Sequence, residues 1–174
     1  MQFLSWLQDL DISQWVAGSD WGYPILLSIH SIGMGTVVGI LAMFNLRVLG
    51  FRRDIPLLAL GKFMNVAWVG FLINATSGLL LFMSAATRLI ANWPFLVKMA
   101  CIIIAGLLSW LLWQSLINDD LRRSRSSADL PANPHLDKGS RIIAGASLVT
   151  WFAAITSGRL IAYVMDHALL KAGL

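Results

Sequence analysis

Four long stretches with almost no charged side chains make up most of this chain, and they restrict its fold more than any other feature. A helix needs about 20 apolar residues to cross a hydrocarbon core of about 30 Å, and in lipid it satisfies its backbone hydrogen bonds within one segment. The stretches predict spans at about residues 22–46, 63–87, 95–118 and 141–165. The sequence therefore predicts an all-α, integral membrane four-helix bundle that forms a single transmembrane domain over residues 1–174.

Composition agrees with a membrane protein. Hydrophobic residues are 57% of the chain and charged residues only 13%, whereas about a quarter of the residues of a soluble domain are charged. The net charge of +4 comes from Lys and Arg that mostly flank the predicted spans. It therefore indicates membrane topology and not nucleic-acid binding. Cys101, inside the third predicted span, is the only cysteine, so an internal disulfide is excluded.

The basic residues predict the orientation of the bundle. Nine of the thirteen Lys and Arg residues fall in the connection between the first two spans and in the connection between the last two. Loops rich in Lys and Arg stay on the cytoplasmic side. Both termini are then expected on the periplasmic side of a bacterial inner membrane. Residues 118–140, which carry acidic, basic and proline residues, are expected to form the longer cytoplasmic loop.

The first 19 residues do not resemble a signal peptide, because Asp9 and Asp11 interrupt what would have to be its apolar core. Apolar side chains instead recur at near-helical spacing, at Phe3, Leu4, Leu7, Leu10 and Trp15. Such a pattern predicts an N-terminal amphipathic helix in the outer membrane interface.

Three ionisable side chains fall inside the predicted spans: His30, Lys98 and Arg159. Such groups cost several kcal/mol in lipid unless they are paired or hydrated, so each one is a functional hypothesis. The rise of about 1.5 Å per helical residue puts all three in the outer half of the bundle. Asn74, in the second span, lies slightly deeper.

A histidine and two cations at one depth, with no carboxylate inside any span, predict an anionic ligand. Haem b meets this requirement, because its iron takes imidazole as a ligand and its propionates need cationic partners. His30 and Lys98 are the candidate iron ligands, with Met34 or an open position as alternatives to Lys98 at the sixth site. If Lys98 does not bind iron, it serves as a propionate partner. Further cofactor-binding candidates are Arg159, Asn74 and Gly33, the last because a glycine near His30 leaves room for a flat macrocycle.

Other interpretations of these residues stay open. His30 is equally suited to an interhelical hydrogen bond with a serine or a backbone carbonyl. The shallow Lys98 and Arg159 are also suited to reaching the outer headgroups with their charged ends.

A resemblance to known proteins supports the cofactor hypothesis. Residues 21–50, the segment Ser77-Gly78-Leu79-Leu80-Leu81-Phe82, residues 95–99 and Ser157-Gly158-Arg159 resemble a bacterial four-helix membrane family of unknown function. More distantly, His30 and the Val97-Lys98-Met99 segment are similar to the histidine and lysine of the four-helix bacterial protoporphyrinogen oxidases. The second resemblance implies that haem b is bound.

The function expected from these observations is that of a haem b-binding membrane subunit, which transfers electrons near the periplasmic face to other membrane or periplasmic redox subunits. A protoporphyrinogen oxidase-like enzyme is one alternative, although an electron-transfer or accessory subunit is favoured over a stand-alone enzyme. A haem-free structural or transport subunit that handles copper is another, with Met83, Met165, Asp166 and His167 as its ligands. Lipid contact is expected, nucleic acid is not, and homo-oligomerisation is left open.

The predicted topology can be tested with reporter fusions. An enzyme that is active only in the periplasm should work when fused after Leu174 and should fail when inserted near Ser127, since that residue lies in a basic loop. Activity at Ser127 together with inactivity at Leu174 would reverse the orientation of the whole bundle.

Overall fold

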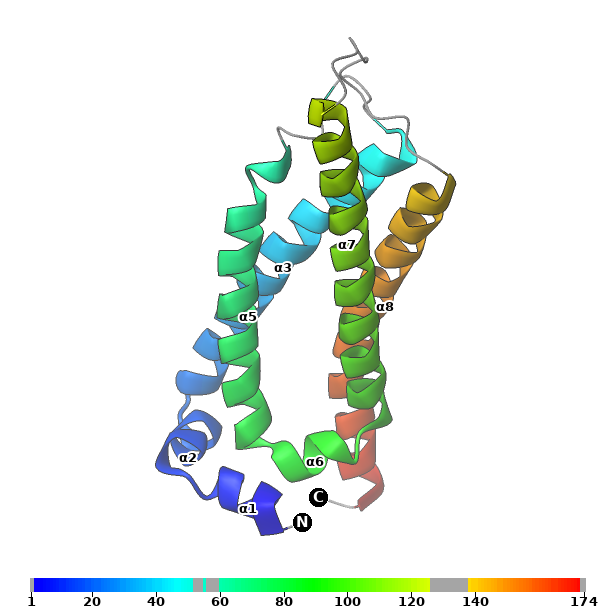
Figure 1. The fold of residues 1–174 in the computed structure, drawn as a ribbon. Coiled ribbons are helices and arrows are strands. Elements are labelled where there is room, and N and C mark those ends of the chain that lie inside the picture. Colours follow the sequence, from blue (N-terminus) through cyan, green and yellow to red (C-terminus); the bar gives the residue numbers. More distant parts are fainter. Residues whose placement is uncertain (1, 52–54, 56–59, 126–137, 173–174) are drawn as a thin grey trace.

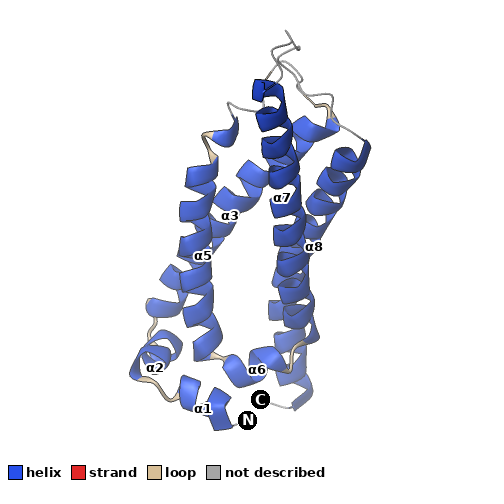
Figure 2. Ribbon diagram, in the orientation of Figure 1, coloured by secondary structure: helices blue, strands red, loops and turns tan. Residues whose placement is uncertain are grey.

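The computed structural model describes residues 2–51, 55, 60–125 and 138–172. These described residues form seven α-helices and no strand, as Figure 2 shows. In chain order the helices are α1 (Gln2–Gln8), α2 (Asp11–Gly18), α3 (Gly22–Leu49), α5 (Met64–Ser84), α6 (Ala86–Ile90), α7 (Trp93–Arg125) and α8 (Lys138–Ala172).

Four of the helices contain segments long and apolar enough to cross a membrane: Gly22–Leu49, Met64–Ser84, Trp93–Leu116 and Lys138–Val164. Their outward faces carry large apolar side chains, such as Ile32 and Val149, which are 69% and 70% exposed. An apolar surface of this extent is expected where lipid, and not water, surrounds the protein. The all-α prediction is confirmed for the described residues, and four helices have the length and composition of membrane spans, so the chain has the features of a multi-pass membrane protein.

The helices differ from the prediction in several places. The second span ends at Ser84, because Ala85 leaves the helical conformation (φ −143°) and α6 then runs in a new direction. The N-terminal segment forms two short helices instead of one, since Leu10 is extended between them (ψ 138°). α7 continues to Arg125, so the expected loop at residues 118–140 begins later than predicted. His135 lies outside the described residues.

The four long helices form two pairs, α3 with α5 and α7 with α8, and α3 and α8 join the pairs. Figure 1 shows α3 crossing behind the bundle from α5 towards α8. Over their described residues, α5 and α7 share little contact beyond the stacked rings of Phe82 and Phe95. The spans therefore follow the order α5, α3, α8, α7 around the bundle, with an unpacked side between α5 and α7.

The contact between α3 and α5 is close because glycines line it. A Cβ atom at Gly33 would lie 2.9 Å from both the Gly70 carbonyl oxygen and the backbone nitrogen of Asn74. Real Cβ atoms do not approach backbone atoms this closely, so only glycine at position 33 permits this packing. Small residues at helix contacts in membranes allow such approach of the backbones.

The two ends of the bundle differ. The capped end, defined by α1, α2 and α6, also holds the start of α1 and the end of α8 (Figure 1). The opposite end is called the basic end, because Arg47 lies in the last turn of α3 and Lys138 begins α8 there. α3 stops at this end at Gly50, which has a left-handed conformation (φ 104°). A hydrophobic cluster fills the basic end and consists of Phe44, Val48, Leu60, Leu112 and Ala144.

The α3–α5 contact gives a stability prediction. Gly33→Ala should lower the unfolding temperature in detergent, because the added methyl group forces the two backbones apart at a typical overpacking cost of about 1–3 kcal/mol. Gly35→Ala is the matched control, since a Cβ atom there meets nothing within 4 Å. Equal effects of the two substitutions would show that α3 and α5 do not pack this closely.

Candidate functional site

His30 projects from α3 against α5. Its Nδ1 atom lies 2.9 Å from the backbone carbonyl oxygen of Asn74 and 3.2 Å from the hydroxyl of Ser77. The Asn74 side chain completes the contact, because its Nδ2 atom donates to the His30 carbonyl oxygen at 2.8 Å. The interhelical hydrogen bond that was one interpretation of His30 is therefore present, and it engages only one of the two ring nitrogens.

These contacts assign the tautomer of the neutral ring. A carbonyl oxygen only accepts hydrogen bonds, so the short contact with Asn74 requires the proton on Nδ1. The Ser77 hydroxyl already donates to the Ile73 carbonyl oxygen at 2.6 Å. Nε2 then carries the lone pair. Within the described part of the chain it has no hydrogen-bond partner, and it is not fully enclosed.

Gly78 sets the position of the ring. A Cβ atom at Gly78 would lie 2.8 Å from Cε1 and 3.2 Å from Nδ1 of His30. The imidazole therefore rests directly on the α5 backbone, one turn beyond Asn74. Any larger residue at position 78 would displace the ring.

Lys98 reaches towards the same region from α7. Its half-buried side chain lies along α8 at Gly158, where a Cβ atom would be 3.5 to 3.7 Å from its last three atoms. It is near enough to His30 for the two charges to interact. Among the described residues, Nζ has no hydrogen-bond or ion-pair partner.

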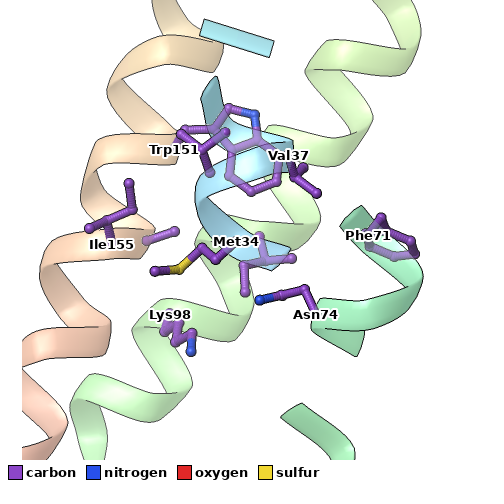
Figure 3. Close-up of a pocket in the computed structure, with 10 residues that line it drawn as sticks. Met34, Val37, Phe71, Asn74, Lys98, Trp151 and Ile155 are labelled. Atoms are coloured by element: carbon purple, nitrogen blue, oxygen red, sulfur yellow. The ribbon is translucent and has the colours of Figure 1, made fainter. Parts of the chain in front are cut away.

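Lys98 and Asn74 both line a pocket between the four spans. Its other walls are Met34, Val37 and Val38 of α3, Phe71 of α5, Ile102 of α7, and Trp151, Ala154 and Ile155 of α8. Figure 3 shows Met34 between Lys98 and Asn74, with Trp151 and Phe71 on the surrounding walls. The enclosed space is about 30 Å³, and the volume reaches about 410 Å³ only when the open surroundings of the pocket are included. Two polar side chains thus meet in an otherwise apolar pocket.

The structure brings some of the predicted site residues together and separates others. His30, Asn74 and Lys98 converge on one region. Arg159 does not join them, because its side chain is exposed on α8 and has no hydrogen bond or ion pair within the described residues. Gly33 does not leave room for a flat ligand, since α5 fills the space beside it.

Sequence reasoning missed a buried polar network beside the pocket. Trp151 Nε1 donates to the Ser109 hydroxyl at 3.4 Å, Ser109 lies 3.1 Å from the Ser147 hydroxyl, and Asn45 Nδ2 donates to Ser147 at 3.1 Å. The network connects α3, α7 and α8. In the sequence, Asn45, Ser109 and Ser147 stand out only as polar residues within apolar helices. One sequence contains no pattern that shows which of them contact one another.

A metal site built from protein ligands alone is not found in the described residues, which contain no group of three His, Cys, Asp or Glu side chains. Three of the four residues expected for copper, Met165, Asp166 and His167, have side chains outside the described part of the structure. Comparison with protein-family models, curated proteins and solved structures found no match to this chain. The resemblances inferred from the sequence motifs therefore stay predictions.

The tautomer of His30 can be measured. In protein labelled with ¹⁵N-histidine, NMR should show His30 protonated on Nδ1 and not on Nε2, with the signal assigned by its loss in His30→Ala. Gly78→Ala should shift this signal, because the new methyl group collides with the ring. Gly158→Ala should not, since its Cβ atom would make only ordinary contacts. A proton on Nε2 in the native protein would contradict the assignment.

Proposed function

We propose that the protein binds haem b at His30 and carries electrons within the membrane. The observation that carries the proposal is the state of the His30 ring: a backbone carbonyl accepts a hydrogen bond from Nδ1, while Nε2 has no partner among the residues that the structure describes. Histidines that bind metals usually donate their other ring N–H in this way, which fixes the tautomer and directs the lone pair at the metal.

Lys98 supports the same proposal. An unpaired cation among apolar walls is unfavourable by itself, and a bound carboxylate would compensate it. Haem b presents two propionates, and Lys98 is a cation that lines the pocket beside Asn74, the contact residue of His30. Lys98 therefore serves as a propionate partner, or, if it is deprotonated, as the sixth iron ligand.

The pocket residues suit part of the haem b group. Lys98 lines the pocket together with aromatic walls from Trp151 and Phe71, and the His30 imidazole lies beside it, against Asn74. The macrocycle cannot lie over Gly33, where the sequence suggested room, because α5 occupies that space. It would instead need the mouth of the pocket on the unpacked side between α5 and α7.

When bound, haem b would supply a one-electron carrier. The chain's own part is to hold the imidazole by Asn74 and Gly78, to offer positive charge through Lys98 and to exclude water with apolar walls. Such a site suits transfer to other membrane or periplasmic redox subunits. We assign the capped end to the periplasmic side of the bacterial inner membrane, since the basic connections lie at the other end.

The proposal predicts a b-type spectrum. Protein purified from haem-replete cells should give the α band of haem b in a reduced-minus-oxidised spectrum, with one haem per chain. His30→Ala should abolish the band, because it removes the iron ligand, while His135→Ala should leave it unchanged. A full band in His30→Ala would disprove coordination by His30.

Two further variants distinguish the role of Lys98 from that of Arg159. Lys98→Met should alter the optical or EPR signature if lysine binds iron, and should change only the reduction potential if lysine pairs with a propionate. Arg159→Gln is the matched control, since its side chain is exposed and outside the pocket. Equal effects of Lys98→Met and Arg159→Gln on both the spectrum and the reduction potential would contradict the special role of Lys98.

A further inference from the structure

The capped end of the bundle is closed. α1 contacts α5 and α6, and α2 contacts α3 and α5. The Thr87 hydroxyl of α6 donates a hydrogen bond to Gln8 Oε1 of α1 at 2.9 Å. Phe82 of α5 stacks on Phe95 of α7, with ring centroids 5.6 Å apart and planes inclined by 12°. A ligand that arrives at this end from water meets these helices before it reaches the pocket.

The basic end is closed as well. The hydrophobic cluster around Phe44 and Leu112 fills it, and Trp113 packs against the cluster. Between this cluster and the pocket lies the network of Asn45, Ser147 and Ser109, in which Asn45 and Ser147 are buried. Neither end of the bundle therefore gives direct access to Lys98.

The side between α5 and α7 is different, because small residues face it. Ala75 shares one side of α5 with Phe71 and Phe82, and its side chain is exposed. Gly106 shares one side of α7 with Phe95 and Ile102 by helical spacing. A Cβ atom at Gly106 would meet nothing within 4 Å. Below the stacked rings of Phe82 and Phe95, this side is thus open.

The opening faces lipid, since both helices are long and apolar enough to cross the membrane. A ligand that enters here must dissolve in the bilayer. It must also carry negative charge, because Lys98 is unpaired and the described membrane-spanning segments contain no acidic side chain that could pair with it. These two requirements define an amphipathic molecule with an apolar body and an acidic group.

We infer that the opening between α5 and α7 is the entrance through which a lipid-soluble carboxylate reaches Lys98 and His30 from the bilayer. The inference deepens the proposed function, since haem b belongs to this class of ligand, but it does not require haem. The acidic group binds the Lys98 ammonium, and the apolar body lies against Met34, Trp151 and Phe71.

Binding can be tested without haem. The full-length protein in phosphatidylcholine nanodiscs is titrated with spin-labelled stearic acid, and the motionally restricted EPR component is measured. Lys98→Met should weaken the association by roughly 10-fold or more, the effect of losing a charge-assisted hydrogen bond. Lys98→Arg should retain it, and so should Arg159→Gln, which removes a cation outside the pocket. Equal association in the native protein and Lys98→Met would overturn the inference.

The choice of carboxylate is tested in the same assay. Spin-labelled phosphatidylcholine should show no dependence on Lys98, because it has no net charge. Spin-labelled phosphatidic acid should compete poorly with stearate. If phosphatidic acid associated more strongly and with the same dependence on Lys98, the site would be one for phosphate headgroups and the carboxylate assignment would be wrong.

The entrance itself is tested by narrowing it. Haemin is supplied in liposomes, and the growth of the Soret band is followed in Ala75→Trp and Gly106→Trp, each compared with Gly35→Trp, whose position is exposed and open on α3. The first two variants should load several-fold more slowly than the control and reach the same final yield. Unchanged loading rates would overturn the lateral entrance and leave the haem proposal intact.

Failure of all variants to load haem would instead overturn the proposed function, while the stearate titration would still decide the inference. A second copy of the chain is the other candidate to cover this side. If Ala75→Cys, combined with Cys101→Ala, formed a disulfide-linked dimer in native membranes, the opening would be a subunit interface and the entrance would be disproved.

Discussion

The close approach of α3 and α5 is the constraint on which the candidate site depends. Gly33 and Gly70 bring the two backbones together, and this contact places the Asn74 carbonyl within 2.9 Å of His30 Nδ1. That carbonyl is part of a helix and is not normally free for side chains. His30 reaches it because Gly78 has no side chain in the way. The direction of the imidazole is therefore determined by contacts with the α5 backbone and not by contacts with other flexible side chains.

How much of this could be read from the sequence depends on the physical quantity concerned. Hydropathy determines which segments cross a membrane, so the four spans were predicted closely. The end of α5 at Ser84 was not, because alanine at position 85 favours helix and the turn depends on contacts of α6 with α1 and α7. The two N-terminal helices were likewise predicted as one, since the apolar spacing continues across Leu10.

The site illustrates a similar division. Counting residues along a helix gives the depth of a side chain, and it predicted one level for His30 and Lys98. It does not give the rotation of the helix about its axis, which packing determines. Arg159 has a similar predicted depth, yet its side chain is exposed. Gly33 shows a related ambiguity, because a glycine marks space in the sequence but does not tell whether a ligand or a neighbouring helix fills it.

The distribution of polar contacts explains why one side of the bundle can stay open. Asn45, Ser147 and Ser109 join α3, α8 and α7 by hydrogen bonds, and His30 with Asn74 joins α3 to α5. In an apolar environment these bonds are not exchanged for bonds to water, so they hold the helix pairs without help from a hydrophobic effect between helices. α5 and α7 share no hydrogen bond of this kind in the described residues, and apart from the Phe82–Phe95 stack little joins them. The pocket therefore combines rigid walls, which fix His30 and Lys98, with one side whose closure the fold does not require.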